Sequence, residues 1–363
     1  MSNTKIKIAI VTSSLANGGM ERFSALLSKM LVQLGFEIHV ITILDEIEYE
    51  FDGKLLNLGL LKKKDDSILG RVKRSIALRN YIKQFQFDWI IDNRIRTSNL
   101  SEWIISNFIY KPERTIYLVH NFKIEKYFPR RFELARKIYR KSPYIIAVSK
   151  EIERQIVDKY NYQNTLTLYN PVDLIKLNNM AEEMVISGKF ILAYGRIDDA
   201  HKNYSLLIES YARSLLPENG IDLYIIGDGK DLDTIKEKVG NLQLQDKVIF
   251  KSKMANPFPY VKGALFTTLT SRNEGFPLVI IESLALGTPV ISVNCQSGPK
   301  EIIQNEVNGL LVENHNSEVF ANAMNRFLLD QELYNRIKLN AVDSVANLSV
   351  EEVKKQWLRI LTK

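Results

Sequence analysis

The chain has 363 residues, 45% hydrophobic and 25% charged, so it can build two domains with full cores and has the composition of a globular protein. A single cysteine, Cys295, excludes an intrachain disulfide and a cysteine-ligated metal cluster. No apolar run approaches the roughly 18 residues of a membrane span and no signal sequence is recognisable, so we expect a cytoplasmic protein.

The net charge of +7 is unevenly distributed. Residues 1–175 hold 28 Lys/Arg against 19 Asp/Glu, or +9, and the remainder holds 21 against 23, or −2. This asymmetry favours an anionic partner, either lipid or nucleic acid, for the first half. The candidate basic residues are Lys62, Lys63, Lys64, Arg71, Lys73, Arg74, Arg130, Arg131, Arg136, Lys137, Arg140 and Lys141.

Short Val/Ile-rich runs alternate with longer amphipathic runs along the chain. Lys5–Thr12 and Lys189–Tyr194 open the two halves in the same way, each followed by turn residues and a helical pattern. Apolar strands alternating with helices indicate parallel sheets covered on both faces, so we predict two doubly wound, Rossmann-like α/β domains. The other predicted strands are Glu37–Ile43, Trp89–Asp92, Thr115–Val119, Tyr144–Val148, Thr165–Leu168, Asp222–Ile226, Lys247–Phe250, Leu265–Leu269 and Val290–Val293.

The domain seam is predicted after Asn170-Pro171-Val172-Asp173. We expect an N-terminal domain over 1–175, a C-terminal domain over 176–348, and a helix over 349–363 that packs back toward the N-terminal domain. Ligands of doubly wound sheets bind outside the carboxyl ends of the strands, so two such domains facing each other would enclose an interdomain cleft.

Two carboxylates eight positions apart, Glu274 and Glu282, mark the most informative stretch. Pro277 suits the first position of a helix and Gly287 the left-handed residue just past its end, which predicts a helix of about three turns. In the alternative, purely structural interpretation, Glu274 only caps the helix and Glu282 is a solvated surface carboxylate.

The first turn of this helix leaves the N–H groups of Leu278, Val279 and Ile280 without intrahelical acceptors, so a phosphate would bind there. Glu274 would then accept hydrogen bonds from sugar hydroxyls, and Glu282 would bind a ribose diol. The order sugar, diphosphate, ribose fits a sugar nucleotide.

Other candidates also follow predicted strands. Gly18 and Gly19 leave the backbone open to a phosphate, although a plain tight turn explains them equally well. Arg196 and Lys202 could bind a diphosphate, or be surface charges. Gly227-Asp228-Gly229 would shape a wall for a base.

His120 follows the predicted strand Thr115–Val119. It could hydrogen-bond a sugar hydroxyl or share a proton with the acceptor, or be a satisfied core histidine.

In this order the motifs resemble the retaining family-4 glycosyltransferases of the GT-B fold, and the resemblance covers nearly the whole chain. Its central motif, Glu-Gly-Phe-Pro-Leu followed by Cys295-Gln296-Ser297-Gly298-Pro299, is most similar to the bacterial branch that builds lipid-linked oligosaccharides, lipopolysaccharide (including O-antigen) and capsule. The motifs that carry the resemblance are Gly18-Gly19-Met20-Glu21-Arg22, Asn170-Pro171-Val172-Asp173, Gly195-Arg196, Lys202-Asn203, Gly227-Asp228-Gly229 and Glu274 with Glu282.

The resemblance implies transfer of a hexose or N-acetylhexosamine from a UDP-sugar, with GDP-sugar still open, to a lipid-linked, lipopolysaccharide or capsule glycan. It also implies retention of configuration and a place on the cytoplasmic face of the inner membrane. Glu274, His120, Arg196 and Lys202 are the implied catalytic residues. The implied donor-binding residues are Gly18, Gly19, Arg196, Lys202, Gly275, Phe276, Leu278, Val279 and Glu282.

No cofactor or metal is expected, because the fold implies none and Asp231-Leu232-Asp233 lies at a helix start, where capping acids are common. Front-face attack on the donor and double displacement through Glu274 both remain open. The competing functions are a non-catalytic GT-B homologue and another GT-B enzyme such as an epimerase. No nucleic-acid-binding module is recognisable.

The acceptor side is expected to contact an anionic membrane through the basic N-terminal domain. Phe122–Phe132 interleaves aromatic and cationic residues, which favours membrane contact for the 122–141 stretch. For Ile68–Phe85 we expect a helix with its apolar face inward and solvated lysines outside.

Overall fold

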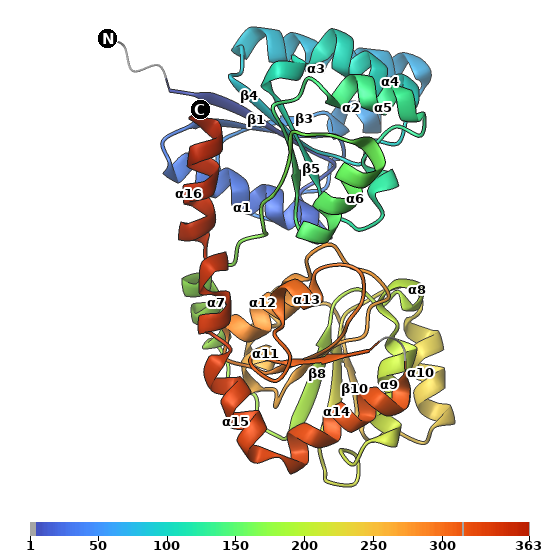
Figure 1. Cartoon of the computed structure of the whole chain (residues 1–363). Coiled ribbons are helices and arrows are strands. Elements are labelled where there is room, and N and C mark those ends of the chain that lie inside the picture. Colours follow the sequence, from blue (N-terminus) through green and yellow to red (C-terminus); the bar gives the residue numbers. More distant parts are fainter. Residues whose placement is uncertain (1–4, 314–315, 363) are drawn as a thin grey trace. The chain divides into compact units, whose positions relative to one another are not determined.

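The computed structural model describes residues 5–313 and 316–362, which form two compact units. The first unit combines Met1–Asn170 with Glu351–Lys363, and the second unit runs from Pro171 to Val350. The chain therefore leaves the first unit once and returns to it with its last helix (Figure 1).

The first unit is built on a parallel sheet of seven strands in the order β3-β2-β1-β4-β5-β6-β7. Its register pairs Ile8 with Ile38 on one side and with Trp89 on the other. The order reverses at β1, so the β1/β4 edge is the switch point where doubly wound sheets bind ligands. The strands are β1 Lys7–Thr12, β2 Glu37–Thr42, β3 Lys54–Asn57, β4 Trp89–Asn93, β5 Thr115–Val119, β6 Tyr144–Ala147 and β7 Thr165–Thr167.

Helices cover both faces of this sheet (Figure 1), and its central strands such as β1 and β5 are almost fully buried, whereas the edge strand β3 is partly exposed. One core cluster joins β1 and β4 to α3 through Leu78 and Ile82. The helical segments are α1 Gly19–Gln33, α2 Gly59–Lys64, α3 Ile68–Phe85, α4 Asn99–Ile104, the π-helical turn η1 Ile105–Ile109, the 3-10 turns η2 Pro112–Arg114 and η3 Ile124–Lys126, α5 Phe132–Tyr139, α6 Lys150–Tyr160 and α16 Val350–Leu361.

The second unit has a six-stranded parallel sheet in the order β10-β9-β8-β11-β12-β13. As in the first sheet, the strand order reverses, here at β8, so the switch point lies between β8 and β11. The prediction of two doubly wound domains is therefore confirmed. The strands are β8 Phe190–Tyr194, β9 Asp222–Ile226, β10 Val248–Lys251, β11 Thr267–Leu269, β12 Val290–Val293 and β13 Leu310–Val312.

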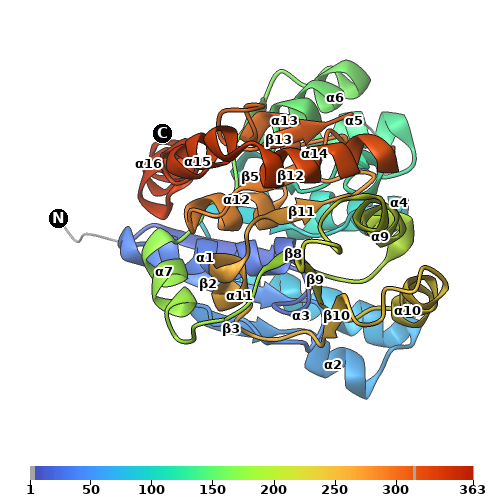
Figure 2. The ribbon, with the colours of Figure 1, turned by 90° about the horizontal axis from the view of Figure 1, so that it is seen from below.

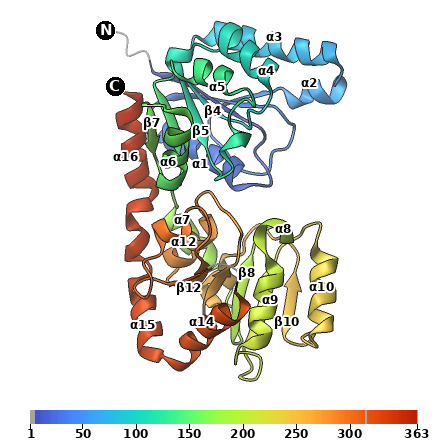
Figure 3. The same cartoon turned by 45° about the vertical axis from the view of Figure 1, so that its right-hand side comes forward.

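The core on one face of this sheet joins β8, β9 and β12 to α9, α10 and α14, which Figures 2 and 3 show side by side with the strands. Tyr211 is buried there, and its hydroxyl donates to the carbonyl oxygen of Ile221 at 2.7 Å. The helical segments are α7 Leu174–Ala181, α8 Asp199–Lys202, α9 Tyr204–Arg213, α10 Leu232–Asn241, α11 Phe258–Gly263, α12 Leu278–Ala285, α13 Pro299–Ile302, α14 Ser317–Leu329, α15 Gln331–Asn340 and η4 Asp343–Leu348.

Two strands, β3 and β13, are absent from the sequence prediction. Each lies at the edge of its sheet and is short. Leu55 and Leu56 are the only apolar residues of β3, and Leu55 is exposed. An edge strand with one open side does not need the long apolar run by which the central strands are recognised.

The expectation for Ile68–Phe85 is only half right. Leu78 and Ile82 face the core, but Ile68 and Leu69 are 79% and 71% exposed. Helix α3 is apolar on two sides, so its sequence does not separate into one inward apolar face and one polar face.

Helix α16 belongs to the first unit by its contacts. Val353, Trp357 and Ile360 form the buried stripe that their spacing predicts, and Trp357 is fully enclosed. The indole N–H of Trp89 donates to the carbonyl oxygen of Leu361 at 3.0 Å, which fastens the end of the helix to β4. Across the described residues, every helix is too short or too polar to cross a bilayer.

Candidate functional site

The candidate site of the second unit lies at the carboxyl ends of β8 and β11. Arg196 lies two residues after the end of β8, Lys202 ends the short helix α8, and Glu274 lies between β11 and α12. Because β8 and β11 are adjacent parallel strands at the switch point, the fold brings these three loops to one edge of the sheet.

Helix α12 begins at Leu278, one residue later than predicted. Pro277 is its N-cap, with φ −70° and ψ 107°, and Gly287 is left-handed with φ +73° just past the end, as its sequence predicts. The helix has eight residues and is therefore shorter than the expected three turns. The amide of Ile280 already donates to the carbonyl of Pro277 at 3.2 Å, so Leu278 and Val279 are the half-exposed first-turn residues left for an anion.

The loop that carries Glu274 is held by the segment after β12. The Glu274 amide donates to the carbonyl oxygen of Gln296 at 2.7 Å, and the Ser297 hydroxyl donates to that of Gly275 at 2.9 Å. Gly298 has φ +95°, and a Cβ there would lie 2.6 Å from Cδ of Pro277. This glycine allows the two loops to pack closely, which fixes Glu274, Gly275 and the buried Phe276.

Lys202 is positioned by a second set of loop contacts. Asn203 adopts the left-handed conformation between α8 and α9, with φ +54°. The hydroxyl of Thr270 donates to the carbonyl oxygen of Lys202 at 3.0 Å, and the Arg272 amide donates to that of His201 at 2.9 Å. These bonds join the α8 loop to the β11–α12 loop.

The two loops meet in an ion pair between Lys202 and Glu274, whose Nζ and Oε1 atoms are 2.7 Å apart. Glu274 is buried, at 8% exposure. Burial alone would raise the pKa of its carboxyl, but the Lys202 ammonium outweighs that effect and holds the pKa below its usual value. The pair therefore stabilises the fold above the unfolded-state pKa of the carboxyl and loses this contribution as the pH falls through the folded-state value.

Glu282 is buried, so the alternative interpretation of Glu282 as a solvated surface carboxylate is wrong. It projects from α12 and accepts a hydrogen bond from the Tyr194 hydroxyl at 2.8 Å, while the same hydroxyl lies 3.3 Å from the carbonyl oxygen of Val279. The bond from Tyr194 therefore holds the Glu282 carboxylate of α12 next to the carboxyl end of β8.

Arg196 is exposed and lines a small hollow of about 160 Å³ at the carboxyl ends of β8 and β9. Gly227 and Gly229 form part of the adjoining turn, where a Cβ would lie only 1.9 Å from the Gly195 oxygen and 2.0 Å from the Ile197 oxygen. The hollow is lined by Tyr194, Gly195, Arg196, Ile226, Gly227, Asp228, Lys253, Met254 and Pro257.

Asp231 is the N-cap residue of α10, but its carboxylate does not cap that helix. Its Oδ2 accepts from the Asp199 amide at 2.7 Å, at the start of α8. This bond gives Asp231 a structural part in holding the Lys202 loop.

In the first unit, Gly18 and Gly19 lie at the start of α1, after the loop that follows β1. Gly18 is the N-cap with extended backbone, and Glu21, three residues later, folds back over it. This is the position of the acidic partner in a capping box, so Glu21 occupies the end of α1 where an anion would approach.

His120 follows β5 and packs against Phe23 of α1, with ring centroids 4.8 Å apart. Its Nε2 atom is buried with no hydrogen-bond partner among the described residues, so it is not a satisfied core histidine. Burial and the nearby Arg96 guanidinium lower the pKa of His120 to about 3. Its ring is therefore neutral near pH 7.

We expect the carbon-bound ring protons of His120 to keep constant NMR shifts between about pH 5 and 8, where an ordinary histidine titrates. Because the folded-state pKa lies below the unfolded value, His120 stabilises the fold fully above about pH 6.5, and this contribution falls as the pH drops toward 3. An inflection near pH 6.5 assigned to His120 would contradict this. A His120→Gln variant provides the assignment.

Sequence reasoning missed a buried ionic cluster at the carboxyl end of β4. Asp92, Arg94 and Glu102 are joined by the Arg94 guanidinium, which lies 2.7 Å from Asp92 Oδ2 and 3.2 Å from Glu102 Oε2. Arg96 is fully buried and donates to four carbonyl oxygens, including those of Leu118 and Tyr127 at 2.9 and 3.0 Å. Asp92, Arg94 and Arg96 alternate after an apolar strand, which is the signal that could have revealed them.

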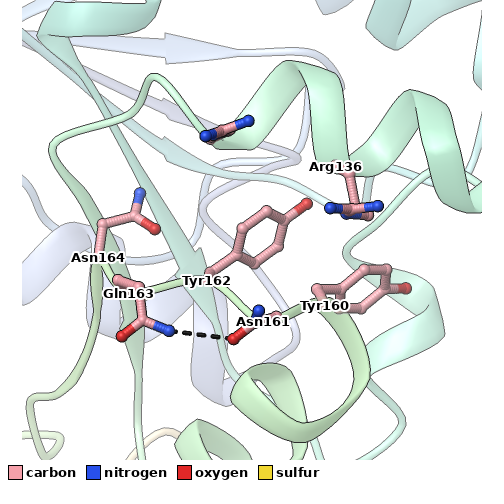
Figure 4. A pocket seen from close by; sticks show the side chains of 7 residues that line it. Arg136, Tyr160, Asn161, Tyr162, Gln163 and Asn164 are labelled. Carbon is pink, nitrogen blue, oxygen red and sulfur yellow. Dashed lines mark hydrogen bonds between the residues drawn. The ribbon is translucent and has the colours of Figure 1, made fainter.

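The basic 122–141 stretch is less exposed than its sequence predicts. Tyr127 and Phe128 are buried, and Phe132 is the one aromatic residue of Phe122–Phe132 above a third exposed. Arg136 of α5 and Arg140, just after that helix, instead border a cavity of about 470 Å³ with Tyr160 and Tyr162 (Figure 4). Since its loop leads into β7, this cavity lies at the amino edge of the sheet, away from the switch point.

Comparison with known proteins identifies two matching family models. The description "Glycosyltransferase Family 4" matches residues 17–176, and "Glycosyl transferases group 1" matches residues 181–343. The two matches therefore cover most of the chain, one in each unit.

Two relatives align over nearly their whole length. An N-acetylgalactosamine-N,N'-diacetylbacillosaminyl-diphospho-undecaprenol 4-alpha-N-acetylgalactosaminyltransferase from Campylobacter jejuni is 29% identical over 92% of this chain and 93% of its own. The amylovoran biosynthesis glycosyltransferase AmsD from Erwinia amylovora is 22% identical over 98% and 99%.

Two solved structures share the fold. Anabaena HepE in complex with UDP and glucose has a TM-score of 0.79 at 18% identity, covering 99% of this chain and 100% of its own. Staphylococcus aureus TarM, solved with UDP among its ligands, has a TM-score of 0.77 at 15% identity over the same shares.

Proposed function

Because the chain belongs to the family-4 glycosyltransferases of the GT-B fold, we propose that it transfers a hexose or N-acetylhexosamine from a UDP-sugar to a lipid-linked, lipopolysaccharide or capsule glycan. The observation that carries the donor site is the ion pair between the half-buried Lys202 and the buried Glu274, in the loop before α12. The names of the Campylobacter and Erwinia relatives support the acceptor class.

In this proposal the donor lies along α12. Its diphosphate binds Arg196, Lys202 and the first-turn amides of Leu278 and Val279, its ribose diol binds Glu282, and its sugar faces Glu274. The small size of the hollow beside Arg196 supports a pyrimidine base, and HepE was solved with UDP.

The departing UDP gains negative charge as the bond from the anomeric carbon to its phosphate oxygen breaks. Arg196, Lys202 and the helix end oppose that charge, and one such preorganised contact contributes about 2.7–4 kcal/mol. We therefore propose that leaving-group stabilisation by these groups is the main source of rate acceleration and that no metal ion is required.

We propose retention by front-face attack, in which the acceptor hydroxyl passes its proton to a donor phosphate oxygen. The Lys202 ammonium beside Glu274 supports this choice over double displacement, because a carboxylate held in an ion pair at 2.7 Å is a weakened nucleophile. Glu274 then orients the donor sugar. His120, Gly18 and Gly19 stay predicted donor contacts, and the neutral ring of His120 suits a hydrogen-bonding role.

Thermal unfolding with UDP-, GDP- and ADP-sugars tests the donor. We expect UDP-sugars to raise the melting temperature most, because a ligand at 100 times its Kd stabilises the folded chain by about 2.7 kcal/mol. The shift should disappear in Lys202→Ala and persist with a metal chelator.

Equal shifts with all three nucleotides would contradict UDP selectivity. No shift with any of them would favour a non-catalytic homologue. Release of UDP and a glycosylated product from an undecaprenyl-diphosphate saccharide then tests the acceptor class.

A further inference from the structure

The neighbouring helices α2 and α3 expose several large apolar side chains. On α3, Ile68, Val72 and Ile76 recur every four residues and are 79%, 50% and 51% exposed, and Leu69 lies beside them. Leu60 and Leu61 extend the set onto α2, the neighbouring helix in Figure 3. We call these six residues the α2–α3 surface.

The α2–α3 surface is held firmly by the fold beneath it. On its other side α3 buries Leu78 and Ile82 in the core of the first unit. The turn between the helices is fixed by Asp65, whose carboxylate accepts from the Ser67 amide at 3.0 Å and whose carbonyl oxygen accepts from Arg74 at 2.6 Å. These contacts fix the orientation of α3, so the six apolar side chains of the surface are exposed in the folded protein.

Positive charge surrounds this apolar surface. Residues 59–85 contain eight Lys/Arg and two Asp, a net charge of +6, and one of these cations, Lys63, pairs with Asp45 outside the segment at 2.7 Å. Both aspartates are engaged, Asp65 with Lys73 at 3.4 Å and Asp66 with Arg74 at 3.0 Å. The whole chain carries +7, so these 27 residues account for nearly all of the excess.

Aromatic side chains continue the surface beyond α3. The Arg79 side chain donates to the carbonyl oxygen of Phe108 at 3.1 Å, which joins α3 to η1. Phe108 and Trp103 are 54% and 43% exposed, with ring centroids 5.4 Å apart. Aromatic rings next to exposed leucines and cations are typical of a surface that lies at the head-group level of a bilayer.

From these contacts we propose that the α2–α3 surface docks the protein on an anionic lipid bilayer, with its apolar side chains inserted and its lysines and arginines against the lipid phosphates. A second copy of the same face is disfavoured, since two surfaces with a net positive charge would repel each other. The 122–141 stretch is a poorer candidate because most of its aromatic residues are buried. The inference rests on the proposed function in one respect, that a lipid-linked acceptor requires access to a membrane.

Vesicle binding by the full-length chain tests this surface. Ile68→Ser combined with Leu69→Ser should weaken binding to phosphatidylcholine/phosphatidylglycerol vesicles at least about tenfold, because each side chain loses apolar burial. The matched control is Leu329→Ser with Leu339→Ser, two leucines of the second unit that are 70% and 80% exposed, and its binding should equal wild type.

The charge contribution is tested with Lys64→Gln combined with Arg71→Gln. This variant should also bind anionic vesicles about tenfold more weakly, wild-type binding should fall with added salt, and phosphatidylcholine vesicles alone should bind poorly. Arg130→Gln with Arg131→Gln should stay within about twofold of wild type.

Wild-type vesicle binding by the Ile68/Leu69 variant would overturn the proposal, as would an equal loss in the Leu329/Leu339 control. A wild-type dimer that this variant converts to monomer without loss of vesicle binding would assign the surface to a second copy instead. The nucleotide-induced thermal shift is measured on the same variants. A chain that binds vesicles but no UDP-sugar would contradict the proposed function and leave the docking surface intact.

Discussion

Replacing Lys202 with alanine is expected to lower kcat/KM for sugar transfer by about two to three powers of ten. The change removes a cation from the departing diphosphate, and loss of one preorganised donor of this kind costs about 10²–10³ in rate. It also leaves Glu274 buried without the ammonium that now lies 2.7 Å away, so the pKa of that carboxyl rises. UDP release in the presence of donor and acceptor measures the effect.

A surface ion pair of the same unit provides the control. Lys262 lies 3.2 Å from Glu182, and both side chains are substantially exposed, so Lys262→Ala should stay within about twofold of wild type. Combining Lys202→Ala with Glu274→Gln should cost less than the sum of the two single changes, because the residues act as a pair. Wild-type turnover in a folded Lys202→Ala variant would remove the proposed donor site.

Arg96→Met is expected to lower the free energy of unfolding of the first unit by about 3–5 kcal/mol, the usual cost of removing one partner from a buried ionic cluster. The methionine keeps the length of the side chain but deprives four carbonyl oxygens of their donor. It also leaves Asp92, whose Oδ1 lies 3.6 Å from the Arg96 guanidinium, with only Arg94 as its cation.

Tryptophan fluorescence during urea unfolding reports this change selectively. The chain has three tryptophans, Trp89, Trp103 and Trp357, and all belong to the first unit. Arg130→Met, at an exposed position of the same unit, is the matched control and should change stability by less than about 0.5 kcal/mol. If Arg96→Met does not fold, the milder Arg96→Lys takes its place. A midpoint like that of the control would show that Arg96 is dispensable.

The central strands of both sheets could be predicted from sequence because each is a continuous apolar run closed by turn residues, as in Thr115–Val119. The strands β3 and β13 could not, because β3 has only two apolar residues and β13 is a run of only three residues, which is too short to be separated from a loop. The α12 region was predictable from Pro277 and Gly287, although the helix proved shorter, because the Pro277 N-cap and the Gly287 loop each take residues from its ends.

The sequence could not show which distant residues become neighbours in the folded chain. Lys202 and Glu274 are 72 residues apart, and only the adjacency of β8 and β11 brings them together. The burial of Glu282 beside Tyr194 likewise depends on how α12 packs on the sheet. In α3, the apolar residues were expected to form one face toward the core. Leu78 and Ile82 do so, whereas Ile68 and Leu69 lie on the exposed side of the helix.

The return of α16 to the first unit bears on the order in which the protein can mature during synthesis. Residues 171–350 emerge from the ribosome as one uninterrupted segment and carry every strand of their own sheet. The first unit is completed only when the buried stripe of α16 has been translated and the end of the helix can accept the Trp89 hydrogen bond. Domains usually fold in the order in which they are made, whereas here the segment translated second can be finished first.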